Sequence, residues 1–291
     1  MEKILAVIFC FFLTQGLWAQ EYEFLGLLKF NQTTMISYRL VFTEHNGKIE
    51  GFSVTDLQGE NETKNRISGT YDRKSKVFKF DEMDIEYTKS VINTKDFCYL
   101  HFTGKIELTD KSRIKGKFRG LFQDGKECVN GSLELIGSAK AYERINKMEK
   151  RIKKFQNSKK ATPELKQPVD LAPMVEKLKV NTLRKNEKTT VYLRADKVDL
   201  TIWDGGKEDG DKVSIVINGK PFLENYTVTN AKKTMSITLD RPVTMVKIEA
   251  IGEGAAAPNT SRLSFAVADQ SIDLTTDLKE GDTTTVQIIK K

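Results

Sequence analysis

The stretch RIKGKFRGLF, residues 113–122, decides the fold of the first part of the chain. Every second residue from Ile114 to Phe122 is apolar or glycine, and the residues between them are mostly charged. This two-residue period is typical of an antiparallel strand that has one face in a core and the other in water. Seven further short runs, separated by polar turns, surround it at 26–30, 35–42, 48–54, 66–71, 77–87, 97–108 and 131–136.

Glycines inside these runs indicate how the strands are arranged. Gly51, Gly69, Gly104, Gly116 and Gly131 each interrupt an otherwise apolar face. Interior glycines weaken a strand and usually mark bends where a sheet coils tightly. Tight turn signals such as Asn46-Gly47 join consecutive runs, as in a meander. Residues 20–137 are therefore predicted to form an eight-stranded antiparallel barrel of lipocalin or avidin type, with a two-sheet sandwich as the alternative.

The first 19 residues have the pattern of a secretory signal peptide. A charged start is followed by the apolar run Ile4–Leu13 and by Ala19 as a small residue for cleavage. The run is about half the length that a bilayer span needs, so no transmembrane segment is expected. Exported proteins fold in an oxidising compartment, so Cys98 and Cys128 are predicted to form a structural disulfide.

Residues 138–157 change to a helical period. Apolar residues recur every three or four positions and form one stripe, beside many cations. Residues 158–188 lose this period, contain three prolines and read as a linker. The whole chain carries a formal charge of +7, yet residues 138–188 alone hold 15 Lys and Arg against 6 Asp and Glu. Any anionic partner should therefore be sought here, and the helix residues Lys147, Lys150, Arg151 and Lys154 are candidates for binding an anionic surface. The alternative is that the stripe docks on a domain while the charges are solvated.

Alternating runs return over residues 189–291. They are four to six residues long, and Asn218-Gly219 supplies a tight hairpin turn. This spacing predicts an antiparallel, immunoglobulin-like β-sandwich, although no cysteine pair supports a true immunoglobulin domain. The expected fold class is therefore mainly β, with an N-terminal barrel, a connecting basic helix and a C-terminal sandwich.

The acidic loop WDGGKEDGD, residues 203–211, is a candidate calcium site. Glycines let carboxylates converge, and the candidate ligands are Asp204, Glu208, Asp209 and Asp211. The EF-hand pattern fails because Ile215 occupies the position of its bidentate glutamate. The alternative is a solvated turn whose acidic side chains bind local amides. No other cofactor is expected.

The barrel interior is a candidate site for a small hydrophobic ligand. Eight strands can enclose one small molecule, and the candidate lining residues are Phe42, Phe80, Phe102 and Phe118. The alternative is that these rings pack together and leave no room.

Signatures of catalysis are scarce. The chain has only two histidines and none of the common hydrolase, metalloprotease or nucleotide-binding motifs. Glu82, Asp84 and Glu86 alternate along one strand and would share a face, which three like charges should turn toward water. No aromatic stacking motif accompanies the basic residues, so nucleic acid is not an expected partner. We therefore expect a protein that is not an enzyme.

The C-terminal region resembles a module of exported Bacteroidota proteins whose role is unsettled. The likeness rests on the motifs Ile202-Trp203-Asp204, Glu208-Asp209-Gly210-Asp211, Asn218-Gly219 and Pro258-Asn259-Thr260. The N-terminal barrel is similar, more weakly, to small secreted barrels of such bacteria. The resemblance implies a location in the periplasm, on the outer-membrane surface or outside the cell.

Three functions follow from these patterns. The first is an interaction module whose partner is an envelope protein or a polysaccharide. The second is a lipocalin-like carrier of a small hydrophobic ligand, and the third is a calcium-assisted glycan-binding protein. The oligomeric state stays open.

Overall fold

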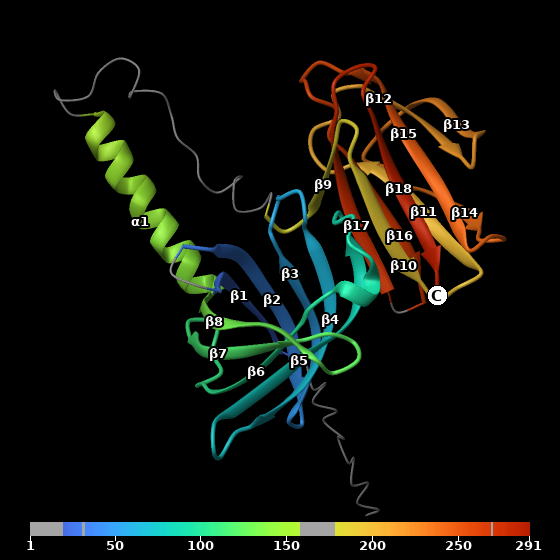
Figure 1. Cartoon of the computed structure of the whole chain (residues 1–291). Helices are drawn as coiled ribbons and strands as arrows, with labels where there is room; N and C mark the ends of the chain where they lie inside the picture. Colours follow the sequence, from blue (N-terminus) through green and yellow to red (C-terminus); the bar gives the residue numbers. More distant parts are fainter. Residues whose placement is uncertain (1–19, 31–32, 158–177, 269) are drawn as a thin grey trace, which may run out of the picture.

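The computed structural model describes residues 20–30, 33–157, 178–268 and 270–291 (Figure 1). The predicted signal peptide, residues 1–19, and residues 158–177 of the predicted linker lie outside this part of the chain. The described residues are mainly β-strand, as predicted.

The first eight strands form the predicted closed antiparallel barrel. Neighbours in sequence pair in order from β1 to β5 and from β6 to β8, while β1 pairs with β8 and β5 pairs with β6. The ring closes where Phe80 lies opposite Phe102. Asn46 and Gly47 both have positive φ, which confirms the predicted tight turn between β2 and β3. The strands are β1 (Gln20–Lys29), β2 (Met35–His45), β3 (Lys48–Thr55), β4 (Thr63–Asp72), β5 (Val77–Thr88), β6 (Tyr99–Lys105), β7 (Arg113–Leu121) and β8 (Glu127–Gly137), and a 3₁₀ turn (Thr94–Asp96) precedes β6.

Aromatic rings pack together in the core of the barrel. Phe80 and Phe102 are fully buried, and their ring centroids lie 5.7 Å apart. Glycine is required beside them: a Cβ atom on Gly104 or Gly116 would lie 2.7 or 3.0 Å from the Phe102 ring. The interior glycines thus make space for rings as well as allowing the sheet to curve. Each fully buried phenylalanine contributes about 2–3 kcal/mol through loss of apolar surface from water.

Helix α1 (Ser138–Gln156) follows β8 directly and matches the predicted helix 138–157 to within one residue. It contacts β1 and β8 near its beginning and extends away from the end of β8 (Figure 1). Ala141 in its first turn is buried, whereas Met148 and Phe155 further along the apolar stripe are exposed.

The second domain consists of two five-stranded layers around one hydrophobic core. One layer has the order β14-β11-β16-β17-β9, and the other has the order β13-β12-β15-β18-β10. Leu200 and Phe265 from the first layer pack with Val213 and Ile248 from the second. The strands are β9 (Asn181–Arg184), β10 (Lys188–Leu193), β11 (Lys197–Asp204), β12 (Asp211–Ile217), β13 (Lys220–Thr227), β14 (Lys233–Thr238), β15 (Val243–Glu253), β16 (Ser261–Val267), β17 (Gln270–Asp277) and β18 (Thr283–Lys290).

Two features of this domain differ from the sequence prediction. Its first strand, β9, lies inside the range 158–188 that was predicted to be a linker, so the strands begin before residue 189. The prediction of a purely antiparallel sandwich was also wrong, because β9 pairs in parallel with β17 and β10 pairs in parallel with β18. Both parallel pairs join segments about ninety residues apart, which local alternation does not reveal. The predicted Asn218-Gly219 turn is confirmed between β12 and β13.

Strand β5 belongs to both domains. Its first half, Val77–Asp81, pairs with β6, and its end pairs with β10 through Tyr87 and Thr88. The barrel and one layer of the second domain are therefore a single thirteen-stranded sheet.

Candidate functional site

A cavity of about 460 Å³ lies at one end of the barrel. Most of its lining residues lie in or next to the connections β1–β2, β3–β4, β5–β6 and β7–β8, which are at the same end of the barrel. We call this end the mouth of the barrel. Most of its wall is apolar, formed by Leu28, Phe30, Ile36, Ile92, Phe97 and Leu100. Its volume falls in the range typical of small-molecule sites.

One of the four residues predicted to bind a hydrophobic ligand lines this cavity. Phe118 forms part of its wall, whereas Phe42, Phe80 and Phe102 lie among the packed side chains of the barrel core. These three rings pack together and leave no room between them, as the alternative interpretation of the sequence predicted. The cavity lies nearer the mouth of the barrel.

A buried carboxylate, Glu82, lies on the wall of the cavity, beside polar side chains such as Asp56 and Asn61. Its Oε1 accepts hydrogen bonds from the Tyr38 hydroxyl at 2.9 Å and the Ser53 hydroxyl at 2.6 Å. Its Oε2 accepts one from the Leu100 backbone amide at 2.8 Å. Burial raises the pKa of Glu82, and these hydrogen bonds oppose that rise.

The position of Glu82 corrects the prediction that it shares a solvent face with Asp84 and Glu86. β5 has one more residue than β4 between the pairs Ile67–Glu82 and Arg66–Asp84. Such a bulge breaks the alternation of a strand. Glu82 lies before the bulge, on the same buried face as Phe78 and Phe80, and points into the barrel. The bulge turns the next two acidic side chains outward, so that Asp84 lies near Arg194 at 3.0 Å and Glu86 near Lys64 at 2.8 Å.

Asn65 lies beside Glu82 and also lines the cavity. Its side-chain amide lowers the pKa of the Glu82 carboxylate, and the residue is 5% exposed. The other end of the amide, Oδ1, is buried and has no hydrogen-bond partner. A buried acceptor left in this state costs about 1–3 kcal/mol.

The predicted disulfide Cys98–Cys128 is confirmed and lies at the mouth, where Cys98 contributes to the cavity wall. The two Cα atoms are 6.0 Å apart, and the bridge joins the segment before β6 to β8. Closing a loop of this length is worth about 3–4 kcal/mol. The bridge thus fixes the separation of two walls of the cavity.

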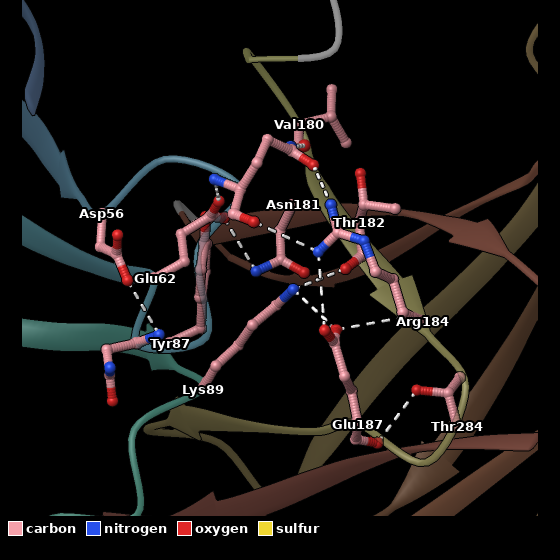
Figure 2. A network of polar contacts seen from close by, with 12 residues as sticks. Asp56, Glu62, Tyr87, Lys89, Val180, Asn181, Thr182, Arg184, Glu187 and Thr284 are labelled. Carbon is pink, nitrogen blue, oxygen red and sulfur yellow. Dashed lines mark hydrogen bonds and ion pairs between the residues drawn. The ribbon is translucent and has the colours of Figure 1, made fainter. Parts of the chain in front are cut away.

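Figure 2 shows a second polar cluster, at the junction of the two domains. The buried Glu62 accepts hydrogen bonds from Tyr87 at 2.8 Å and from Asn181 at 2.9 Å. The Lys89 ammonium, also buried, contacts the Thr182 carbonyl at 2.6 Å and the Glu187 carboxylate at 2.8 Å. Thr63, next to Glu62, lines the cavity, so the mouth and the junction share one segment of chain.

The acidic loop 203–211 uses its carboxylates in local hydrogen bonds. Asp204 accepts from the Gly206 amide, Asp209 from the Asp211 amide, and Glu208 from the Asn230 amide. Within the described ranges, no three or more His, Cys, Asp or Glu side chains are grouped so that they could hold a metal ion. These contacts match a turn that binds its own amides, and the calcium site stays a prediction.

Asp211 differs from the other acidic residues of this loop because it is 2% exposed. One of its oxygens accepts a hydrogen bond from the Thr260 amide, and the other has no partner. Burial, with Asp209, Asp204 and Glu253 nearby, raises its pKa to about 6.

The basic residues predicted to bind an anionic surface are brought together on α1. Lys147, Lys150, Arg151 and Lys154 are all exposed on the helix.

Comparison with known proteins found no relative: no family model, no curated protein and no solved structure matches the chain. Among the residues that the structure describes, no helix has both the length and the apolar composition needed to cross a membrane.

Sequence reasoning missed Glu82 and Asn65 as site residues. The signal available for Glu82 was its alternation with Phe78 and Phe80, which places it on the inward face of the strand. The bulge that turns Asp84 and Glu86 away from that face has no marker in the sequence. The cavity itself depends on which interior positions carry small or polar side chains across several strands.

Proposed function

We propose that the barrel binds a small amphipathic molecule in the cavity at its mouth, so that the protein acts as a carrier or binding protein. The observation that supports this most directly is the cavity itself, an apolar space with a buried carboxylate on its wall. Sites of this kind, mainly apolar with a few placed polar groups, are typical of small-molecule binding.

A larger cavity, of about 620 Å³, lies between the barrel wall and the second domain. It is lined by charged residues of both signs, including Arg66, Glu86, Arg194 and Lys197. Glu86 and Arg194 already form ion pairs with other residues of the chain. The mouth of the barrel therefore offers the better site for a molecule with an apolar body.

The disulfide supports the further proposal that the chain is exported, because disulfides persist in oxidising compartments. We place the carrier in the periplasm, at the outer-membrane surface or outside the cell, in keeping with the resemblance to exported proteins. The second domain, proposed as an immunoglobulin-like module, and the basic face of α1 would supply contacts with an envelope partner.

Binding of the neutral fluorescent probe N-phenyl-1-naphthylamine tests the proposal. We expect saturable binding of one probe molecule, reversed by competing apolar ligands. Val129 lines the entrance and is 38% exposed, so Val129→Trp should fill the entrance and weaken binding about tenfold. Val243→Trp is the matched control, because Val243 in the second domain is 39% exposed. Absence of saturable binding, or equal binding by both variants, would overturn the proposal.

A further inference from the structure

We infer that the ligand of the barrel mouth carries a hydrogen-bond donor, best an ammonium group, which binds between Glu82 and Asn65. This inference rests on the proposed binding function and specifies the chemical class of the ligand. It excludes fatty acids and other apolar anions as the preferred ligands.

The first argument is the absence of a cation beside Glu82. The donors that surround its carboxylate are the neutral groups of Tyr38, Ser53 and Leu100. No ion pair among the described residues includes Glu82, although these residues form sixteen ion pairs elsewhere. A buried carboxylate without a countercharge is costly, and a ligand cation would offset that cost.

The second argument is the unpartnered oxygen of Asn65. The Asn65 amide lies close enough to Glu82 to lower the pKa of that carboxylate, and its Oδ1 is a buried acceptor with no partner. A ligand group that donates to both Oδ1 and the carboxylate would satisfy the two acceptors together. An ammonium has three donors, a hydroxyl has one, and an ether or ionised carboxylate has none.

The third argument is the shape of the site. Apolar side chains such as Leu28, Ile36 and Leu100 form the rest of the wall. The cavity therefore matches a molecule with one donating end and one apolar end. An apolar anion would bring its charge close to Glu82, and like charges in a poorly solvated site repel strongly.

A series of ligands with unbranched ten-carbon chains tests the inference: decylamine, decanol, decyl methyl ether and decanoate. Each is titrated against the probe-loaded full-length protein. We expect affinity to fall in that order, with decylamine at least about tenfold tighter than decanoate. Glu82→Gln should remove most of the preference for the amine over the alcohol. Asn65→Leu should bring the alcohol close to the ether, and it gives a second readout if Glu82→Gln does not fold.

The outcomes separate this inference from the proposed function. If all four ligands displace the probe and decanoate binds as tightly as decylamine, the inference is wrong while the binding function stands. If Glu82→Gln and Asn65→Leu both weaken all four ligands equally, the two residues act only on the fold and the inference also fails. If no ligand displaces the probe, the binding function itself is refuted.

Discussion

At the scale of single residues, Glu82 and Asp211 are two buried carboxylates with different surroundings. Glu82 has several hydrogen-bond donors around it, whereas Asp211 has one backbone donor and three acidic neighbours. Both have a raised pKa because burial disfavours the charged form. Only Glu82 faces a cavity in which a ligand could supply the missing charge.

The raised pKa of Asp211 predicts a stability change between about pH 4 and pH 6. The folded protein holds the Asp211 proton more tightly than the unfolded chain does. Its contribution to stability is therefore greatest below about pH 4, falls as the pH rises to about 6, and is constant above that. Asp211→Asn should raise the melting temperature more at pH 7 than at pH 4.

Calorimetry of the wild type and the variant across this range checks the prediction. Asp240→Asn, at an exposed position, is the control and should give no such pH-dependent difference. A constant difference in melting temperature between Asp211→Asn and wild type at every pH would contradict the assignment.

At the scale of elements, local patterns were sufficient for most of the strands. Alternation located the eight barrel strands, and the two Asn-Gly pairs located hairpin turns, because both signals lie within a few residues of sequence. The helical period gave α1 almost to the residue. The Cys98–Cys128 pair followed from cysteine count and compartment.

What the sequence did not reveal depends on partners far along the chain. The inserted residue in β5 is visible only against β4, and it turns Asp84 and Glu86 away from the inward face that Glu82 shares with Phe78 and Phe80. The parallel contacts of β9 and β10 join segments that share no local signal. The cavity was predicted at the aromatic rings, but Phe42, Phe80 and Phe102 pack in the core, and the space lies nearer the mouth with Phe118 in its wall.

The four exposed basic residues of α1 predict that the protein binds anionic membranes. Each cation near such a surface contributes about 1 kcal/mol, so replacing Lys147, Lys150, Arg151 and Lys154 by Gln should weaken binding about a hundredfold or more. Cosedimentation with phosphatidylglycerol vesicles measures the change, and phosphatidylcholine vesicles should bind neither protein.

A variant with four other exposed lysines replaced has the same net charge and serves as the control: Lys48, Lys74, Lys212 and Lys220. Equal loss of binding in the two variants would show that total charge, rather than α1, attracts the surface.

At the scale of the whole molecule, the junction around Lys89 should decide whether the two domains unfold together. The Lys89 side chain is 2% exposed and binds the second domain through Thr182 and Glu187. Removing one partner of a buried ion pair costs about 3 kcal/mol. Lys89→Met should therefore lower the free energy of unfolding by about that amount.

Urea denaturation checks this value. The control is Lys185→Met, because Lys185 is 64% exposed and pairs with Asp282. Exposed ion pairs contribute about 1 kcal/mol or less. Similar losses in both variants would mean that the Lys89 contacts do not hold the domains together.

Strand β5, shared by the barrel and the second domain, also limits how this protein can be shortened. A chain that ends after α1 would keep all eight barrel strands but would lose β10, the partner of Tyr87 and Thr88. The backbone groups of that strand edge would then face solvent, together with Lys89 and without Glu187. Open strand edges are templates for pairing with other chains. A barrel without the second domain would thus tend to form oligomers through this edge. In the full chain, strand β10 of the second domain pairs with the edge of β5 and keeps it from other chains.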